Sequence, residues 1–155
     1  MSAGAHYPAL LLRELVAEGE ARFPEEACGL VFQGPSGKRA QAMVNVIDRY
    51  HAHDPEHFPR TTRTGYLMEP REQLAALEAA EQGGERLCAI FHSHVDVGAY
   101  FSKEDRAMAV TDEGEALYPG VEYLVLSIKA AGCDALKRFR YEAGGWGESA
   151  VELPG

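Results

Sequence analysis

The chain has 155 residues and a net charge of −9 at pH 7, with 24 acidic side chains against 15 basic ones. A chain this acidic lacks the clustered lysine and arginine that bind nucleic acid or an anionic membrane, so neither is an expected partner. Hydrophobic residues make up 46% of the chain, which suits one domain over 1–155 with a core that needs no disulfide or metal to stabilise it.

The three cysteines, Cys28, Cys88 and Cys133, lie far apart and form no CxxC pair. An odd and sparse count argues against a disulfide framework of the kind found in secreted proteins. No signal-peptide pattern stands at the N-terminus, and no stretch approaches the roughly 20 apolar residues of a membrane span. We therefore expect a protein of the reducing cytoplasm. Cys28 opens a predicted strand, where a buried structural thiol is expected rather than a nucleophile.

Apolar periodicity and turn residues predict the elements in chain order. In the first half these are a helix over 8–22, hairpin strands over 28–33 and 40–47, a polar loop over 48–64 and a short strand over 65–69. In the second half they are a helix from Pro70 to the glycine pair at 83–84, a strand over 86–94, a loop over 95–101, a helix over about 102–110, hairpin strands over 123–129 and 133–142, and a loose tail from about 143.

These elements indicate the α/β class, with a mixed sheet of five to six strands and helices packed on it. The strand over 86–94 is apolar almost throughout, which is typical of a central strand covered on both faces. The order in which the strands pair does not follow from the sequence.

The predicted strand over 86–94 ends in His92, Ser93 and His94. Residues two apart on a strand face the same way, so both imidazoles can point to one place while Ser93 faces the opposite side. Asp105 lies in the first turn of the next predicted helix, and the intervening loop can return it to that place. Two imidazoles and one carboxylate, with water in the fourth position, make a catalytic zinc site rather than a closed structural one.

The same residues also have a plain structural interpretation. Ser102 is a typical helix N-cap, and Asp105, three residues later, is placed to reach back to it. Histidines two apart are often structural or exposed. The two interpretations compete for Asp105, because a carboxylate that binds a metal is not expected to serve the cap fully. The combination of His92, His94, Ser102 and Asp105 favours the metal site.

The pattern H-S-H-x7-S-x-x-D resembles the signature of the JAMM (MPN-plus) zinc metalloproteases. Upstream, the segment PEEACGL at 24–30 is similar to that family's P-x-E-x-C-G-L motif and aligns its glutamate with Glu26. The resemblance extends over about 8–140 of the printed sequence. It implies the JAMM/MPN architecture, which is similar to that of cytidine deaminases.

The resemblance also implies a role for each matched residue. His92, His94 and Asp105 would hold one Zn²⁺ per chain with a bound water. Glu26 would be the general base that takes a proton from this water and returns it to the leaving amine. Ser102 would stabilise the oxyanion of the tetrahedral intermediate. Without the resemblance, Glu26 is no more than a solvated charge beside another glutamate.

Two positions depart from the family pattern. Val95 and Phe101 stand where members commonly carry proline, after the HSH triplet and before the second serine. The metal ligands are unaffected by this change. The rigidity of the loop between them, and with it the fit of a substrate, is left open.

A second histidine-rich segment, HAHDPEH at 51–57, is denser in potential ligands than the predicted site. It lies in a polar stretch with prolines, where ligands are poorly preorganised for a metal. A solvated surface is therefore expected for His51, His53 and His57, and contact of some of them with a substrate stays open.

JAMM substrates are the C-terminal tails of ubiquitin-like proteins, often ending in Gly-Gly, and this short chain resembles the stand-alone bacterial members, which are associated with sulfur carriers. The resemblance implies a zinc-dependent peptidase or isopeptidase that cleaves the tail of a ubiquitin-like sulfur-carrier protein or its amino-acid conjugate.

One alternative is a non-catalytic MPN-type scaffold or binding module, which retention of all five positions disfavours. Another is a RadC-like protein linked to DNA repair, which the HSH triplet and the negative charge disfavour. Whether the protein forms a homodimer is open.

Overall fold

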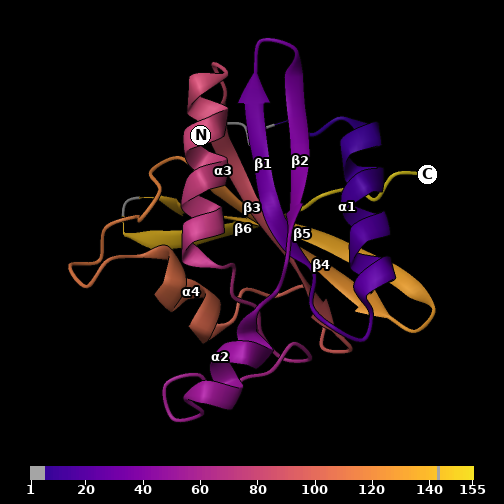
Figure 1. The fold of residues 1–155 in the computed structure, drawn as a ribbon. Helices are drawn as coiled ribbons and strands as arrows, with labels where there is room; N and C mark the ends of the chain where they lie inside the picture. The colour runs from indigo at the N-terminus through magenta and orange to yellow at the C-terminus, as the bar shows by residue number, and fades with distance from the viewer. Residues whose placement is uncertain (1–5, 143) are drawn as a thin grey trace.

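The computed structural model describes residues 6–142 and 144–155, and a six-stranded sheet with helices on both faces forms its centre (Figure 1). The helices are α1 (Ala9–Arg22), α2 (Ile47–His53), α3 (Pro70–Gln82) and α4 (Lys103–Ala109). The strands are β1 (Cys28–Gly34), β2 (Gly37–Met43), β3 (Arg86–Val95), β4 (Glu122–Lys129), β5 (Gly132–Glu142) and β6 (Gly145–Ala150). Within the described ranges, no helix has the length and apolarity needed to cross a bilayer.

The strand order is β2-β1-β3-β4-β5-β6, and each neighbouring pair is antiparallel except β3 and β4, which are parallel. This arrangement confirms the predicted mixed sheet. It places β3 in the interior of the sheet, with β1 on one side and β4 on the other. β3 is buried from Cys88 to Val95, as its continuous apolar run predicts.

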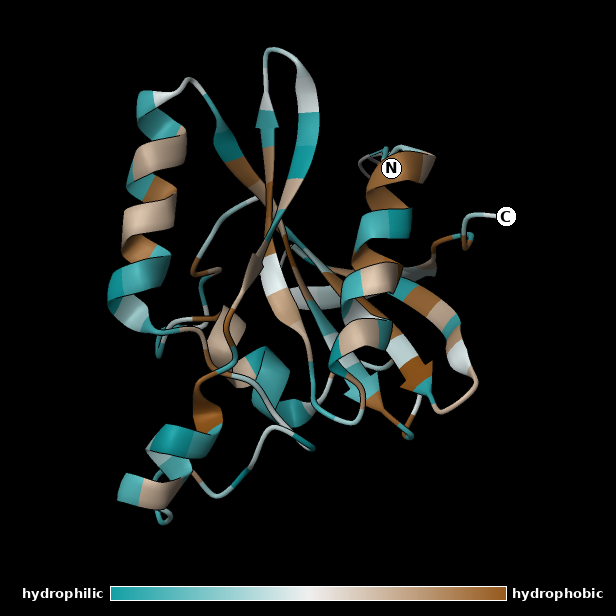
Figure 2. Cartoon of the chain, turned by 45° about the vertical axis from the view of Figure 1, so that its right-hand side comes forward, coloured by the Kyte–Doolittle hydropathy of each residue, from teal (hydrophilic) through white to brown (hydrophobic). Residues whose placement is uncertain are grey.

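Helix α1 covers one face of the sheet. Pro8 stands in an extended conformation immediately before it, and the buried side chains Leu11, Leu12 and Leu15 pack on the apolar residues of β4. Gly19 permits close contact, because a Cβ at this position would lie 2.9 Å from Cδ1 of Ile128. Figure 2 shows hydrophobic residues along the central strands and on α1, while hydrophilic residues gather toward the far end of the β1–β2 hairpin.

Helices α3 and α4 cover the opposite face. Side chains alternate along a strand, so β4 directs Leu124 and Leu126 toward α1 and directs Tyr123 and Val125 toward the cluster that contains Ala76 of α3. In β3 the same alternation sends Ser93 to the α1 face and both histidines to the α4 face. The two histidines of β3 therefore lie on one face of the sheet, and Ser93 lies on the other.

The prediction of a loop over 48–64 is wrong in its first part, because helix α2 occupies Ile47–His53. This short helix is stabilised by residues distant in sequence. The carboxylate of Asp48 accepts hydrogen bonds from the backbone and the hydroxyl of Thr62, and Arg49 forms a 2.7 Å ion pair with Glu69. No local periodicity could indicate contacts of this kind.

Two strand predictions are wrong in their bounds. The strand expected over 40–47 is β2, which runs from Gly37 to Met43, and the strand expected over 65–69 is reduced to an isolated bridge between Met68 and Asn45. The tail expected to be loose from about 143 contains β6, which pairs with β5. Trp146 explains this pairing, because its ring lies 4.7 Å from that of Phe101 and anchors β6 on the aromatic core.

We predict that Leu15→Ala lowers the free energy of unfolding by about 2 to 5 kcal/mol, because it leaves a cavity between α1 and the sheet. Leu15 has no exposed surface, whereas Leu10 of the same helix is 72% exposed. Leu10→Ala should therefore change the free energy by no more than about 0.5 kcal/mol. Urea denaturation of both variants measures the difference, and equal losses would contradict the packing described for α1.

Candidate metal centre

Three side-chain atoms converge where β3 ends and α4 begins. The Nε2 atoms of His92 and His94 lie 3.2 Å apart, and Oδ2 of Asp105 lies 3.1 Å from the first and 3.2 Å from the second. All three side chains are buried. The sequence prediction that these residues come together at one place is met by the structure.

The spacing of these atoms fits a tetrahedral metal. Ligand atoms of a tetrahedral zinc with bonds of about 2.0–2.1 Å are about 3.3 Å apart, and the observed triangle has sides of 3.1, 3.2 and 3.2 Å. A closed structural site would need a fourth protein ligand in the same shell. The triangle leaves one side of the site for water or a substrate.

The hydrogen-bonding roles of these atoms also point to a cation. Nδ1 of His94 lies 3.2 Å from the carbonyl oxygen of Gly98, which can only accept, so Nδ1 carries the proton of the neutral ring. Nε2 of His94 is then a lone-pair atom that faces the carboxylate of Asp105. Burial lowers the pKa of His92, which favours its neutral form as a ligand. Atoms that are electron-pair donors converge here, and a bound cation relieves their repulsion.

Asp105 serves the helix cap and the site together. Its Oδ2 accepts the backbone N–H of Ser102 at 3.0 Å, while its own N–H donates to Oγ of Ser102 at 3.0 Å. The cap is complete here, and the oxygen that accepts from Ser102 is the one that faces both histidines. A carboxylate oxygen has lone pairs in two directions, and Oδ1 of Asp105 is a further buried oxygen without a hydrogen-bond partner among the described residues.

Glu26 lies beside the two histidines, and the ligand atoms of Glu26, His92 and His94 are within 4.8 Å of one another. It is 4% exposed, unlike the adjacent Glu25, which is exposed. Burial, followed by the nearby carboxylate of Asp105, raises the pKa of Glu26 to about 8. Glu26 is therefore no solvated surface charge, and a cation at the centre would favour its ionised form.

The backbone around Glu26 is tied to three other elements. Its N–H donates to the carbonyl of Thr62 at 2.6 Å, and its carbonyl accepts from Nδ2 of Asn45 at 3.0 Å. On the α1 face, Oγ of Ser93 accepts the N–H of Ala27 at 2.7 Å. The sequence analysis missed these positioning roles, and the only signal for Ser93 was its place between the two histidines.

A cleft of about 240 Å³ opens beside the centre. Its lining includes Glu26, Arg60, His94, Tyr100, Ser102 and Glu104. Ser102 therefore faces the same space as Glu26 and His94. The structure thus brings all five predicted site residues to one end of the sheet.

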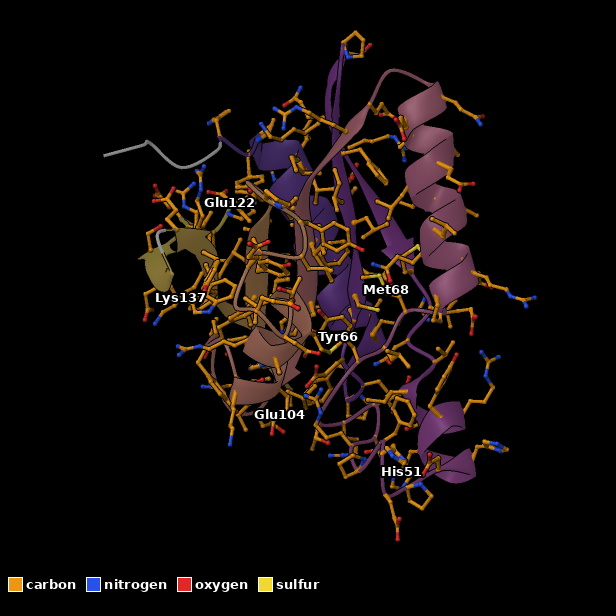
Figure 3. All side chains as sticks on the ribbon, turned by 90° about the vertical axis from the view of Figure 1, so that its left-hand side faces the viewer. His51, Tyr66, Met68, Glu104, Glu122 and Lys137 are labelled. Atoms are coloured by element: carbon orange, nitrogen blue, oxygen red, sulfur yellow. The ribbon has the colours of Figure 1, made fainter. Side chains whose placement is uncertain are left out.

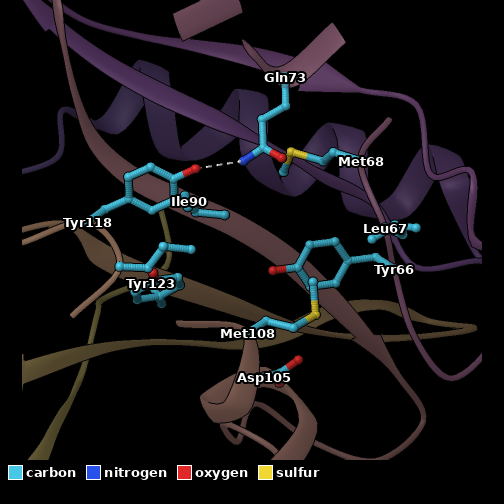
Figure 4. A pocket seen from close by; sticks show the side chains of 10 residues that line it. Tyr66, Leu67, Met68, Gln73, Ile90, Asp105, Met108, Tyr118 and Tyr123 are labelled. Carbon is cyan, nitrogen blue, oxygen red and sulfur yellow. Dashed lines mark hydrogen bonds between the residues drawn. The ribbon is translucent and has the colours of Figure 1, made fainter. Parts of the chain in front are cut away.

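A second, smaller cavity of about 130 Å³ lies on the far side of Asp105, between α3 and α4 (Figure 4). Tyr66 forms one wall and stacks on the ring of His92, with centroids 4.6 Å apart. Gln73 and Tyr118 are hydrogen-bonded across the cavity. Tyr66 thus holds the imidazole of His92 from behind, a role that no sequence pattern indicated.

The loop between the family's two proline positions is anchored by packing. Phe101 is buried and lies 5.1 to 5.2 Å, ring to ring, from Tyr123 and Phe139, while Val95 is also buried. Aromatic contacts therefore restrain the loop at Phe101, one of the two positions where the family pattern has proline.

Two histidines of the segment 51–57 form hydrogen bonds close by in the chain. Nδ1 of His51 lies 2.7 Å from the carbonyl of Phe58, and Nδ1 of His57 lies 2.7 Å from Oδ2 of Asp54. Among the described residues, none of His51, His53 and His57 belongs to the group of side chains close enough to share a metal, which contains Glu26, His92 and His94. Cys28 is buried, and burial raises the pKa of its thiol to about 12, which is unlike a nucleophilic cysteine.

The sequence match to known families covers most of the chain, because the family of prokaryotic homologs of the JAB domain matches residues 8–141. The chain belongs to this family. The JAMM resemblance seen in the sequence is thereby confirmed.

Several curated and solved proteins are similar to this JAB-domain protein. It is 29% identical to proteins named CysO-cysteine peptidase from Mycobacterium tuberculosis and Mycobacterium bovis, over 92% of this chain and 86% of each relative. It is 30% identical to a desampylase from Haloferax volcanii, over 67% of this chain and 63% of the relative.

Two solution structures have the same fold. A protein from Desulfitobacterium hafniense has a TM-score of 0.65 at 24% identity, covering 93% of this chain and 88% of that one. A protein from Salinibacter ruber has a TM-score of 0.54 at 20% identity, covering 95% and 88%. At these identities the similarity supports the fold alone.

We predict that the protein binds one Zn²⁺ ion tightly and that His92→Ala and Asp105→Asn each lose it, because each removes one of three ligands. The asparagine retains an oxygen that can accept the cap hydrogen bond, so this loss would not reflect a damaged helix start. Metal content after zinc loading and gel filtration measures the effect. His53→Ala, at an exposed position of α2, is the control and should bind zinc as the unchanged protein does. Full zinc content in Asp105→Asn would exclude Asp105 as a ligand.

Proposed function

We propose that this JAB-domain protein is a zinc-dependent peptidase or isopeptidase. It acts on the C-terminal tail of a ubiquitin-like sulfur-carrier protein, or releases an amino acid conjugated to that tail. The observation that carries the proposal is the triangle of His92, His94 and Asp105 with the buried Glu26 beside it. The names of the CysO-cysteine peptidase and desampylase relatives support peptidase chemistry on such small proteins.

His92, His94 and Asp105 would hold the zinc ion. When bound, zinc supplies Lewis acidity, which acidifies water and polarises the carbonyl group of a peptide. Asp105 is well suited to this place, because the N–H of Ser102 donates to its carboxylate, and its pKa lies far below the usual range although burial raises it. The carboxylate is therefore ionised and available as a ligand at any physiological pH.

Glu26 has the position and the acidity of a general base. Its carboxylate would accept a proton from the attacking water and then donate that proton to the nitrogen of the leaving amine. Burial, followed by the carboxylate of Asp105, raises its pKa to about 8, and a cation held by the three ligands would favour the ionised form that accepts a proton. Two backbone hydrogen bonds hold Glu26 beside the histidines. Its carbonyl accepts from Asn45, and its N–H donates to Thr62.

Ser102 has a hydroxyl hydrogen free for catalysis. Its Oγ accepts the N–H of Asp105 through a lone pair, so its own hydrogen can point into the cleft that Ser102 lines. There it can donate to the oxygen of a carbonyl group that becomes negatively charged when water adds. The helix cap thus fixes the orientation of the donor.

The tail of a carrier protein would reach the centre through the cleft. β3 is hydrogen-bonded to β1 and to β4, so a tail cannot add to β3 as a further strand. Val97 and Tyr100, 59% and 49% exposed, stand at the rim of the cleft and offer apolar contact to the tail. The small cleft favours a tail that ends in Gly-Gly.

We predict that Glu26→Gln retains zinc and lowers the rate of tail cleavage by about 10²- to 10⁴-fold, because it removes the proton acceptor. Glu25→Gln changes the exposed neighbour in the same way and should leave the rate unchanged. Cleavage of a peptide ending in Gly-Gly-Ala, followed by mass spectrometry, measures both. Glu26→Gln with wild-type turnover would refute the assignment of the base, and zinc-loaded wild-type protein inactive on every carrier tail would favour a scaffold.

We predict that Ser102→Ala lowers the turnover number by about 10²- to 10³-fold, as loss of an oxyanion donor does, while zinc stays bound. Loss of the N-cap should also lower the free energy of unfolding by about 1 kcal/mol. Steady-state kinetics and thermal unfolding separate the two effects. An unchanged turnover number in a protein with the expected loss of stability would leave Ser102 as a cap alone.

A further inference from the structure

Arg60 is a half-buried cation that lines the same cleft as Glu26, His94 and Ser102. Its Nη1 donates to the carbonyl of Thr64 at 3.3 Å, which occupies one of its five N–H groups. No ion pair joins Arg60 to a carboxylate of the described residues. A guanidinium at the edge of a proposed zinc site, without an ion pair to a described carboxylate, is placed to receive an anionic group of the substrate.

The segment that carries Arg60 is hydrogen-bonded to the backbone of Glu26, the proposed general base. The carbonyl of Thr62 accepts the N–H of Glu26 at 2.6 Å, and the backbone and hydroxyl of Thr62 donate to the carboxylate of Asp48 at 2.8 and 2.9 Å. Thr62 is itself buried. Arg60 is therefore held in a fixed relation to the carboxylate of Glu26 rather than on a free loop.

Gly65 supports the position of the Arg60 side chain. A Cβ at residue 65 would lie 2.9 Å from Nε of Arg60 and 3.0 Å from its Cζ. The guanidinium thus packs directly against the backbone of this glycine, which orients it into the cleft.

The charges around the cleft decide which part of a substrate Arg60 can meet. Its charge reaches Glu26, whose pKa it lowers against the larger effects of burial and Asp105. Arg63, on the same segment, is exposed, and Glu104 is an exposed carboxylate on the same cleft. Figure 3 labels Glu104 on α4. Water screens both exposed groups, so Arg60 is the better-placed site for an anion next to the base.

We propose that Arg60 binds the α-carboxylate of a single amino acid that leaves the carrier tail. This inference rests on the proposed function and narrows its substrate class: the scissile bond joins the carrier's last glycine to the α-amino group of one C-terminal amino acid. It does not join the glycine to the side chain of a lysine in a second protein. Arg60 is then the residue that determines specificity on the leaving side of the bond.

The chemistry of the leaving group explains why a residue that binds its carboxylate would lie beside Glu26. Hydrolysis adds water across the amide, leaves a carboxylate on the carrier and releases the amino acid, whose nitrogen takes its proton from Glu26. The α-carboxylate is two bonds from that nitrogen, so its binding group must lie beside the proton donor, where Arg60 lies. A lysine side chain has only methylene groups at this distance and would leave the guanidinium without an anion, which loses a charge-assisted, bidentate pair.

The test compares a peptide ending in Gly-Gly-Ala as the free acid with the same peptide as the C-terminal amide, and with the same tail joined to Nε of a lysine. The zinc-loaded protein should cleave the free acid about 10- to 100-fold faster, in kcat/KM, than the other two. Arg60→Gln should remove this preference by slowing the acid alone. Arg71→Gln, on the exposed side of α3, is the matched control and should retain the preference.

Binding gives a second readout that does not depend on turnover. In the Glu26→Gln protein, calorimetry should show tighter binding of the acid than of the amide, and adding Arg60→Gln should make the two equal. Equal cleavage of acid and amide by the unchanged protein, or faster cleavage of the lysine-linked tail, would overturn the role of Arg60 and leave the peptidase standing. Failure to cleave any of the three peptides or a whole carrier would overturn the proposed function itself.

Discussion

One carboxylate oxygen, Oδ2 of Asp105, connects the start of α4 to the end of β3. It accepts the N–H of Ser102 and lies 3.1 to 3.2 Å from the facing nitrogens of His92 and His94. Because the same atom completes a helix cap, the ligand geometry follows from where the helix begins and the strand ends. Any change that moves this helix start also changes the centre and the orientation of the Ser102 hydroxyl.

The electrostatics of the centre follow from burying acids in an already acidic chain. Glu26 and Asp105 are both buried, and two nearby carboxylates cannot both ionise cheaply in a dry site. Burial first, and repulsion by the carboxylate of Asp105 second, raise the pKa of Glu26. A divalent cation would relieve this repulsion, and Arg60 relieves only a part, which is consistent with a site built for a metal and an anionic ligand together.

The position of Glu26 beside the histidines results from strand register. β1 and β3 are antiparallel with Cys28 opposite His92, so continuing this register by two residues brings position 26 to position 94. The contacts of Ser93 with Ala27 continue the pairing beyond the end of β1. β3 has a neighbouring strand on each side. The cleft is therefore the route by which a substrate would reach Glu26 and the histidines.

Much of the fold and of the site follows from local pattern. The alternation of a strand puts His92 and His94 on one face, the spacing S-x-x-D marks the start of α4, and apolar periodicity indicates α1, α3 and the central strands. Each of these signals acts over a few residues and is therefore visible in the sequence. The role expected of Glu26 came from family resemblance, because nothing near it distinguishes it from Glu25.

The sequence by itself determined which residues could bind a metal and which elements carry them. Only the tertiary structure decided that β3 and β4 pair in parallel, that α2 and β6 form, that Glu26 is buried, and that Ser93, Asn45 and Thr62 hold its backbone. These features depend on contacts between segments far apart in the chain, such as Asp48 with Thr62 and Phe101 with Trp146. Such contacts become favourable only when the whole sheet has assembled, so no short stretch of sequence can contain their signal.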